Sequence, residues 1–462
     1  MIRRFLPLAA LLLFSIPVFA QSPVGDWEGG LAIPGQPEPL KMILRVADAG
    51  DSLAITLDVP QQGGIGIPAT GVRSTTDSLM VEYSMFGGRF ALAVAADSLY
   101  GTFSQGPGTL PIVLKAGQPL QRPQTPEGPF PYATEEVTVE SEPGVTLAGT
   151  FVKPEGDGPF PTVVFLTGSG AQDRDETIAE HRPFAVIADA LARAGVASLR
   201  ADDRGAGEST GDFSASTLET HLTDAQALLA TVRQRDDVAS VGVIGHSEGG
   251  VTALRLAGDL DFVVTLAGPT LTFAEVYPEQ LRRAVRLSGI DSTAADMYRQ
   301  AVDAALVPLT EAPDAPDDVL RPLMDSAFNE GLVDIPMRDR QQMGLAGPAY
   351  QQVKTQFLDF LLTPGMRSLI SYNPAENIAA LNVPTLALYG GKDFQVPAEM
   401  NASALRAATQ GKPVTVTVIA DANHLFQTAD TGSGAEYGQI EETIAPETLE
   451  MIVAWIAEIG GV

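Results

Sequence analysis

Hydrophobic and polar residues follow two different periods along the chain, and the change of period divides it. Between residues 24 and 117, hydrophobic positions alternate with polar ones or form short β-branched runs, separated by clusters of Gly, Pro, Asp and Ser. Short strands at this spacing are typical of antiparallel barrels and sandwiches, so we predict a small all-β domain over residues 21–117. Its predicted strands are 40–46, 52–58, 78–83, 89–94, 98–103 and 109–114.

From residue 132 onward, continuous β-branched runs alternate with stretches of helical period. Such runs are typical of strands buried on both faces, and strands that alternate with helices form parallel sheets. We therefore predict that residues 132–462 form an α/β domain with a largely parallel sheet, opened by a hairpin at 136–152. The other predicted strands are 162–166, 196–199, 238–244, 262–266, 385–389 and 414–419, and the predicted helices are 184–194, 218–233, 249–256 and 448–459.

The alternation of strands and helices is interrupted between about residue 270 and residue 382. This stretch keeps a helical pattern, as at 273–287 and 350–362, and it contains no run of the buried-strand type. An excursion of this length inside one sheet is longer than an ordinary loop. We therefore predict a helical cap inserted into the α/β domain.

A proline-rich segment, residues 118–131, separates the two predicted domains. Its composition favours an extended and semi-rigid chain. We interpret it as the domain linker. A chain of 462 residues is too long for one ordinary domain, and this division accounts for its length.

The first twenty residues resemble a secretory signal peptide. Arg3 and Arg4 precede an apolar core, and Val18-Phe19-Ala20 forms a small-x-small cleavage site. We expect the chain to be exported, to the periplasm or outside the cell; a membrane anchor is the alternative for this short, proline-containing segment. No later stretch is long and apolar enough to span a bilayer, so we expect no integral membrane segment after signal removal.

Composition narrows the function classes further. The chain has no cysteine, which excludes disulfides, thiol catalysis and a lipid-modified N-terminal cysteine. Its formal net charge is −28, which disfavours nucleic acid and anionic lipid as partners. We expect neither a metal nor an organic cofactor, and the sequence does not indicate an oligomeric state.

The sequence Gly245-His246-Ser247-Glu248-Gly249 lies between the run 238–244 and the helical stretch that follows it. A strand that turns directly into a helix holds its central residue in a strained conformation, and glycines two residues away on each side let strand and helix pack closely. The Ser247 hydroxyl would then project from the turn. We predict that Ser247 is a nucleophile, with Gly245, His246 and Gly249 as its structural support; a merely structural turn serine is the alternative.

A serine nucleophile requires a base and an acid that orients the base. Of the four histidines, His181 and His221 are assigned to structural positions and His246 lies in the turn itself, whereas His424 follows the strand 414–419 at a carboxyl end of the sheet, where open α/β sheets place their sites. We predict His424 as the base. Asp393 follows the strand 385–389 and is the predicted acid; Asp421 competes but lies only three residues before the histidine.

The remaining requirement is a pair of donors for the oxyanion that forms when the serine attacks. The sequence Phe165-Leu-Thr-Gly-Ser-Gly170 ends the strand 162–166, where this arrangement supplies one backbone amide. The second amide comes from the residue that follows the nucleophile. We predict the backbone N–H groups of Ser169 and Glu248 as the oxyanion donors.

Five motifs occur in one order along the α/β domain, and together they resemble the α/β-hydrolase superfamily. The resemblance is closest to bacterial carboxylesterases with an N-terminal β-domain and to serine aminopeptidase-like hydrolases. One departure is Thr167, which stands where many relatives carry a histidine. Asp173, Arg174 and Asp175 are candidates for substrate binding, although a salt-bridge cluster within the loop is the simpler interpretation. The motifs are 168–176, 202–209, 245–249, 390–393 and 422–424.

The resemblance and the predicted triad imply a serine hydrolase that cleaves short-to-medium neutral acyl esters through an acyl-enzyme. The expected partner is a small-molecule ester. A peptidase or amidase with the same triad is the first alternative. The second is a polysaccharide- or surface-binding protein in which the β-domain dominates the function.

Overall fold

The computed structural model describes residues 23–33, 39–50, 52–59, 64–106, 108–117, 121–347 and 350–461. The predicted signal peptide lies outside these residues. The chain divides into two compact units, residues 1–119 and residues 120–462. The boundary falls inside the segment that the sequence predicts to be a linker.

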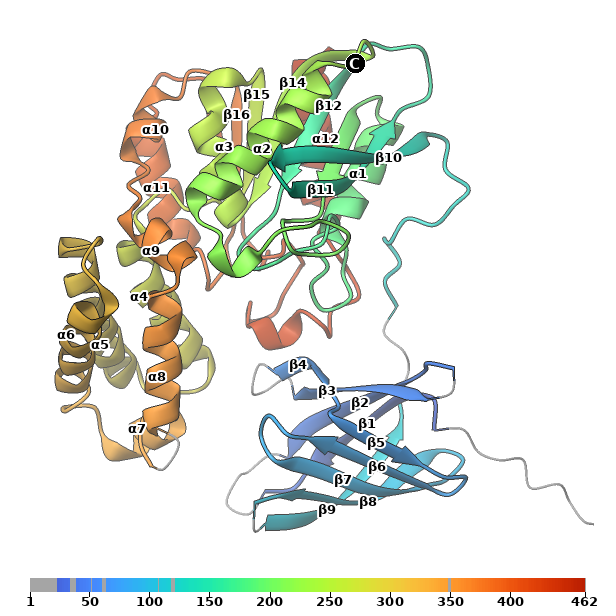
Figure 1. Ribbon diagram of the computed structural model, residues 1–462, viewed down its shortest axis with the longest axis vertical. Helices are drawn as coiled ribbons and strands as arrows, with labels where there is room; N and C mark the ends of the chain where they lie inside the picture. The colour runs from blue at the N-terminus through green and yellow to red at the C-terminus, as the bar shows by residue number, and fades with distance from the viewer. Residues whose placement is uncertain are drawn as a thin grey trace, which may run out of the picture. The chain divides into compact units, whose positions relative to one another are not determined.

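The first unit is one antiparallel sheet (Figure 1). Its order within the described residues is β4-β3-β2-β1-β9-β8-β7-β6-β5. Strands β3 and β5, from opposite ends of this order, are in contact, so the sheet curls toward a barrel. The strands are β1 (Gly25–Leu31), β2 (Leu40–Asp48), β3 (Leu53–Val59), β4 (Gly64–Pro68), β5 (Gly71–Ser74), β6 (Ser78–Tyr83), β7 (Gly88–Val94), β8 (Ser98–Gln105) and β9 (Gly108–Ala116).

Alternation along these strands explains the core of the first unit. In β6 the residues Leu79, Val81 and Tyr83 are buried and their neighbours face outward, because successive side chains of a strand point to opposite faces. Trp27 is buried in the same core, and its indole N–H donates to the carbonyl of Pro23 at 2.7 Å. This tryptophan therefore acts as a core residue of the sheet.

Residues 121–124 of the proline-rich segment are hydrogen-bonded to the second unit. The Arg122 guanidinium donates to the carbonyl oxygens of Ala179, Gly438 and Ile440, at 3.0 to 3.1 Å. The Gln124 side chain donates to the carbonyl of Ile444 at 2.8 Å. Residues from 121 onward are thus part of the α/β unit.

The second unit contains a mixed sheet with the order β10-β11-β13-β12-β14-β15-β16-β17. Strands β10 and β11 are antiparallel, and the strands from β13 to β17 run parallel. Its strands are β10 (Ala133–Glu142), β11 (Val145–Lys153), β12 (Phe160–Leu166), β13 (Ala197–Ala201), β14 (Val238–His246), β15 (Phe262–Leu266), β16 (Thr385–Gly390) and β17 (Val414–Ile419).

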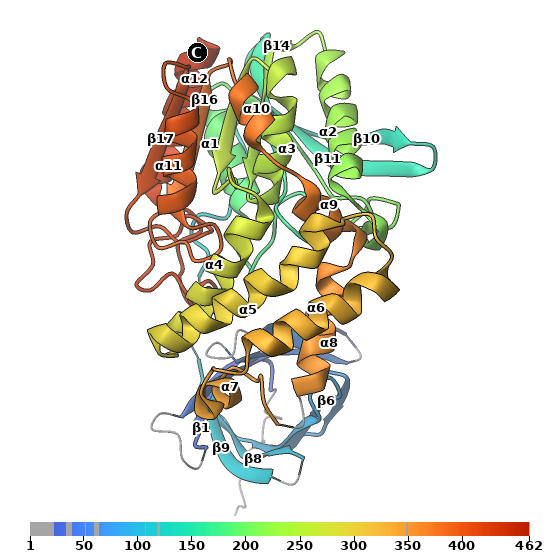
Figure 2. The same cartoon turned by 90° about the vertical axis from the view of Figure 1, so that its left-hand side faces the viewer.

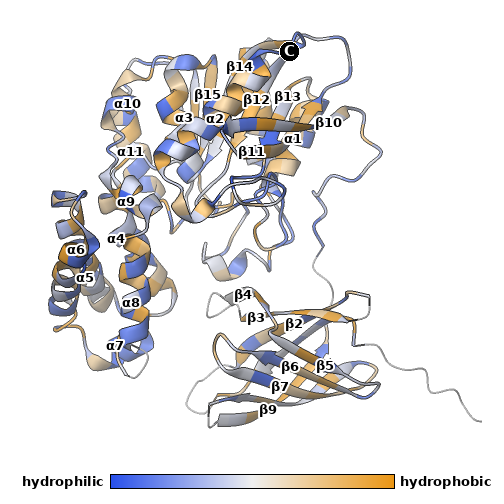
Figure 3. Cartoon of the chain, viewed as in Figure 1, coloured by the Kyte–Doolittle hydropathy of each residue, from blue (hydrophilic) through white to orange (hydrophobic). Residues whose placement is uncertain are grey.

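Helices cover both faces of this sheet. Helix α1 (Pro183–Arg193) packs against α12 (Pro446–Gly460) on one face, and α2 (Leu218–Arg233) packs against α3 (Glu248–Leu256) on the other. Helix α11 (Ala398–Ala408) contacts β16 and β17. The central strands β12, β15 and β16 are buried along their whole length. Figure 3 shows hydrophobic colour concentrated in the central strands, while the helices carry both hydrophobic and hydrophilic residues.

An insertion of helices separates β15 from β16, and it has a hydrophobic core of its own. Figure 2 shows its helices α5 and α6 side by side. The predicted cap is helical as expected. Its helices are α4 (Phe273–Leu287), α5 (Ser292–Glu311), α6 (Asp317–Gly331), α7 (Met337–Gln342), α8 (Tyr350–Leu361) and α9 (Pro364–Ser371), followed by α10 (Ala375–Ala380) against α3 and α11.

Across the described part of the chain, every helix falls short of the length and hydropathy that a bilayer crossing demands.

Candidate active site

Ser247 occupies the turn between β14 and α3. Its φ of 52° and ψ of −117° lie in a region that side chains rarely adopt. The backbone N–H of Ser247 donates to the carbonyl of Leu266 on β15 at 2.8 Å, which ties the turn to the neighbouring strand. The structure thus forms the strained junction that the sequence predicts, and the strain marks a candidate functional residue.

The two glycines of this turn are required by close packing. A Cβ atom on Gly245 would lie 2.3 Å from the carbonyl oxygen of Gly249, and one on Gly249 would lie 2.2 Å from that of Leu166. Backbone atoms cannot move aside as the end of a side chain can. Any side chain at either position would therefore push the serine out of place.

His424 and Asp393 lie together at the carboxyl ends of β17 and β16. The imidazole Nδ1 donates to Asp393 Oδ2 at 2.7 Å, and the aspartate is fully buried. The other oxygen of Asp393 accepts from the amides of Gln395 and Val396, at 2.7 and 3.0 Å. These bonds fix the carboxylate, so one oxygen is always available to orient the histidine ring.

Asp421, the competing acid, lies elsewhere. Its carboxylate pairs with Lys392 at 2.9 Å, and 68% of its side chain is exposed. The structure therefore selects Asp393 as the partner of His424. Ser247 and His424 line the same cavity.

His246 forms a second buried histidine–acid pair directly beside His424. Its Nδ1 lies 2.9 Å from Glu176 Oε1, its Nε2 lies 3.0 Å from the carbonyl oxygen of His424, and the two imidazole rings are 4.7 Å apart. Burial lowers the pKa of His246, but Glu176 and the carbonyl of His424 outweigh it and raise that pKa. Since both ring nitrogens face acceptors, the ring is an imidazolium. His246 thus supports the position of His424.

Glu176 also sets the geometry of the loop after β12. Its Oε1 accepts from the amide of Gly168 at 2.7 Å. Because the Gly168 amide is committed there, the next amide, that of Ser169, is the donor that this loop can offer to an oxyanion.

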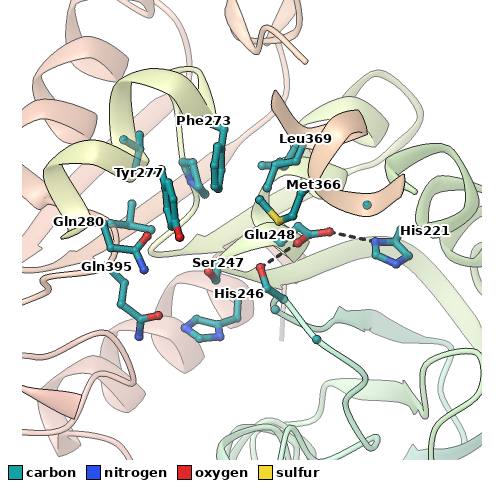
Figure 4. A pocket seen from close by; sticks show the side chains of 18 of the residues that line it. His221, His246, Ser247, Glu248, Phe273, Tyr277, Gln280, Met366, Leu369 and Gln395 are labelled. Carbon is teal, nitrogen blue, oxygen red and sulfur yellow. Dashed lines mark hydrogen bonds and ion pairs between the residues drawn. The ribbon is translucent and has the colours of Figure 1, made fainter. Parts of the chain in front are cut away.

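Glu248 and Ser169, the two predicted oxyanion donors, are joined through their side chains. The Ser169 hydroxyl donates to Glu248 Oε2 at 2.8 Å, and His221 Nδ1 donates to Glu248 Oε1 at 3.1 Å (Figure 4). Burial would raise the pKa of Glu248, but His221 and Ser169 outweigh it and hold that pKa below its usual range. The pKa of His221, which burial would lower, is raised by Glu248 and Asp203.

A cavity of about 710 Å³ opens above Ser247. Figure 4 shows Phe273 and Tyr277 against each other on one side of it and Met366 and Leu369 on another. The Phe273 and Tyr277 rings are 4.6 Å apart and stacked. Cavities of this volume hold drug-sized ligands. The cap contributes Phe273, Val276, Tyr277, Gln280, Phe360, Met366 and Leu369 to its lining.

No lysine or arginine lines this cavity in the part of the chain that the structure describes. Its two glutamates, Glu176 and Glu248, are already bound to His246 and His221. The lining therefore offers a substrate a largely apolar wall with neutral polar groups, and no free counter-charge.

Arg174 and Asp175 of the loop after β12 are ion-paired with residues outside the loop. Arg174 contacts Asp202 and Glu208 at 2.8 and 2.7 Å, and Asp175 pairs with Arg200. Asp173 instead accepts from the backbone amides of Asp175 and Thr177, both at 3.0 Å. The charged residues are thus structural, but their salt bridges tie the loop to other segments and do not form a cluster within it. Thr167, the residue that departs from the family pattern, donates to Asp203 at 2.6 Å.

The sequence did not reveal the roles of two residues of the site, Glu176 and His221. Glu176 received no role, although it lies in the motif 168–176, and His221 was assigned to a structural position. Their spacing from Ser247 carries no signal, because they approach it only through folding. Among the described residues, no group of three or more His, Cys, Asp or Glu side chains is arranged to hold a metal ion.

Comparisons with known proteins found hydrolases that are similar to this chain. A family model described as "Serine aminopeptidase, S33" matches residues 178–289, which contain the turn with Ser247. The esterase EstD of Thermotoga maritima is 26% identical over 332 residues, covering 70% of this chain and 68% of that protein.

Two solved esterase structures are similar to this chain at lower sequence identity. Esterase Pf2001 of Pyrococcus furiosus matches with a TM-score of 0.41 and 16% identity, over 71% of this chain and 90% of that one. Est1E of Butyrivibrio proteoclasticus, solved with ferulic acid bound, matches with a TM-score of 0.38 and 16% identity, over 70% and 96%.

Proposed function

We propose that this chain, which belongs to the α/β-hydrolase superfamily and is a hydrolytic enzyme of the esterase type, cleaves neutral carboxylic esters through an acyl-enzyme on Ser247. The observation that carries the proposal is the 2.7 Å bond between His424 and the buried Asp393, on the cavity that Ser247 also lines. This supplies a base, its orienting acid and a serine held in a strained turn.

The first half of the reaction forms the acyl-enzyme. His424 Nε2 accepts the proton of Ser247 Oγ as that oxygen bonds to the ester carbonyl carbon. Asp393 holds the proton on Nδ1, so that Nε2 is free to act as the base. The amides of Ser169 and Glu248 receive the negative charge that develops on the carbonyl oxygen. The carbon–oxygen bond to the alcohol then breaks, and His424 donates its proton to the leaving alkoxide.

The second half releases the acid. Water takes the place of the alcohol, His424 removes its proton, and the resulting hydroxide attacks the acyl carbon. The bond to Ser247 Oγ breaks and the serine recovers its proton from the imidazolium. The enzyme returns to its initial state with no cofactor consumed.

A peptidase or amidase with the same triad is the competing function. A free peptide terminus is charged, and its recognition requires an opposite charge in the site. The cavity has no lysine or arginine among the described residues, and Glu176 and Glu248 are bound to histidines. The lining therefore favours neutral esters over peptides with free termini.

The test is Ser247→Ala, assayed with p-nitrophenyl butyrate. Loss of the nucleophile is expected to lower kcat about 10⁶-fold while thermal unfolding is unchanged. A fluorophosphonate probe should label the parent on Ser247 and leave the variant unlabelled. Parental turnover by Ser247→Ala, or labelling of a different residue, would refute the proposal. Comparing kcat/KM on aryl esters and on aminoacyl anilides separates esterase from peptidase.

A further inference from the structure

Glu248 contributes to the site twice. Its backbone amide follows the nucleophile and starts α3, while its side chain turns to the loop after β12 and binds the hydroxyl of Ser169 at 2.8 Å. The two residues whose amides are proposed to receive the oxyanion are therefore connected by their side chains. His221, from α2, holds the other oxygen of the same carboxylate at 3.1 Å.

We propose that the Glu248 carboxylate is a positioning residue that sets the separation of the two oxyanion donors by binding Ser169, with His221 holding the carboxylate in place. The inference rests on the proposed function, because the donors matter only if Ser247 attacks a carbonyl. It assigns a role to side chains that the triad leaves unused.

The contacts of the loop after β12 show why this bond is needed. Thr167 Oγ1 and the amide of Gln172 bind Asp203, at 2.6 and 2.9 Å, and so tie down the two ends of the loop. The tip between them, Ser169 and Gly170, is exposed, and Gly170 has a φ of 96°. The bond from Ser169 to Glu248 is the one that connects this tip to α3.

Small displacements of the tip have large consequences for the reaction. An oxyanion donor acts at about 2.7–3.1 Å, and loss of one donor costs about 10²–10³ in kcat. A hydrogen bond to a carboxylate is about twice as strong as a neutral one, so it is suited to hold an exposed loop. Loosening the tip should cost part of the full effect of losing the amide.

His221, which binds the other oxygen of the Glu248 carboxylate, reduces an electrostatic cost of placing that carboxylate here. A carboxylate next to a developing oxyanion would repel it, and the repulsion would be large in a partly buried site. Burial lowers the pKa of His221, but Glu248 and Asp203 outweigh it and raise that pKa, which favours a positive charge against the carboxylate. Such a charge offsets the repulsion, so that Glu248 can bind Ser169 with less opposition to the reaction.

The experiment compares Ser169→Ala, Glu248→Ala, Glu248→Gln and the double variant Ser169→Ala/Glu248→Ala in the full chain. Ser169→Ala retains the backbone amide. Because the Ser169 side chain is exposed, the variant is expected to fold like the parent. We expect kcat on p-nitrophenyl butyrate to fall about tenfold with KM changed less than about twofold, since the loss is confined to the transition state. The rate of fluorophosphonate labelling of Ser247 should fall by a similar factor.

The other variants test whether the two side chains act together. Glu248→Ala should lower kcat at least as much as Ser169→Ala, and Glu248→Gln should recover part of the loss because its amide oxygen still accepts from Ser169. The double variant should be no slower than Glu248→Ala alone, because both changes remove the same bond. A double variant slowed by the product of the two single effects would overturn the proposal, and so would parental kcat in Ser169→Ala.

A matched control is available in the cap. On α6, the Ser326 hydroxyl donates to Glu330 Oε1 at 3.0 Å, which is the same chemistry away from the site. Ser326→Ala should keep parental kcat and KM; a tenfold fall there would overturn the assignment of the effect to Ser169. Ser247→Ala distinguishes failure of the proposed function from failure of this inference. If Ser247→Ala remains active, the proposed function fails. If it is inactive while Ser169→Ala keeps the parental kcat, only this inference fails.

Discussion

The cavity has two sides of different construction. We call the residues at the carboxyl ends of the sheet strands the floor, which comprises Ser247, His424, Asp393, His246 and Glu248 with their partners. We call the cap residues of α4, α8 and α9 that line the cavity the roof. The floor is held by hydrogen bonds between buried polar groups, whereas the roof consists mainly of packed aromatic and aliphatic side chains.

This difference indicates that the floor must hold its atoms in fixed positions, whereas the roof need not. Two floor residues are held in backbone conformations that folding must impose: Glu176 and Ser247 have φ of 53° and 52°. Such strain persists only where the surroundings determine it. Packing contacts in the roof have no direction, so they restrict the size and polarity of a substrate but not the position of a proton. Changes in the floor should therefore alter kcat, and changes in the roof should alter KM.

Among the changes that compare floor and roof, the largest effect after Ser247→Ala is expected from Asp393→Asn. Oδ1 of Asp393 accepts from two backbone amides, so the asparagine must place its NH₂ group against His424 Nδ1. The imidazole is then forced into the tautomer that carries its proton on Nε2, and it cannot accept the proton of Ser247. We expect kcat on an aryl ester to fall about 10⁴-fold with little change in KM.

Asp421→Asn is the matched control for this prediction. Asp421 lies three residues before His424, is largely exposed and pairs with Lys392. Its kcat should stay within about twofold of the parent, because an exposed pair contributes little. Equal losses in Asp393→Asn and Asp421→Asn would mean that the floor does not depend on one buried acid.

The next effect is expected from Glu176→Gln, and it concerns stability. The folded protein raises the pKa of His246 above the ordinary value of 6.5. The stability that this charge contributes is therefore fully present below about pH 6.5 and is lost as the pH rises through the raised pKa. Glu176→Gln should lower the free energy of unfolding by about 3 kcal/mol at pH 6, because it leaves a buried charge without its partner.

Urea unfolding at a series of pH values checks this. The gap between parent and Glu176→Gln should narrow as the pH rises above 6.5 and through the raised pKa of His246, since the parent loses the charge of His246 there. A gap that widens as the pH rises would contradict the imidazolium assignment.

The smallest effect is expected from the roof. Tyr277 stacks on Phe273 and lies 6.2 Å from Phe360 between ring centres, so Tyr277→Ala removes apolar wall without touching the triad. We expect KM for p-nitrophenyl octanoate to rise about tenfold, corresponding to the roughly 1–2 kcal/mol of an aromatic contact, with kcat unchanged.

The short ester p-nitrophenyl acetate serves as the internal control for Tyr277→Ala, because its two-carbon acyl group offers the apolar roof much less surface to contact than octanoate does. Its kcat/KM should stay close to parental. If Tyr277→Ala lowered kcat on both esters equally, the separation between a catalytic floor and a binding roof would be wrong.

Much of the floor could be predicted from local sequence. The turn with Ser247 is a contiguous motif, and its flanking strand and helix have clear periods. His424 and Asp393 each follow a buried strand, and the carboxyl ends of parallel strands meet at one edge of the sheet. The predicted export signal lies outside the described residues and stays a prediction.

Sequence reasoning could not decide contacts between residues that are far apart in the chain. The sequence favoured Asp393 over Asp421 as the acid, but it could not show that Lys392 binds Asp421 while Asp393 contacts the imidazole. Nor could it join Glu176 to His246, which are 70 residues apart.

The sequence by itself determined most strands, the main helices, the cap and the strained serine turn, because these depend on periodicity and on residues that are neighbours in the chain. It missed β1, β4, β5 and α11. Tertiary structure alone decided which buried charges are paired. Burying an unpaired charge costs several kcal/mol, so each must find a partner, and that partner is defined by space and not by spacing. The pairing of Glu248 with Ser169 and His221 is of this second kind.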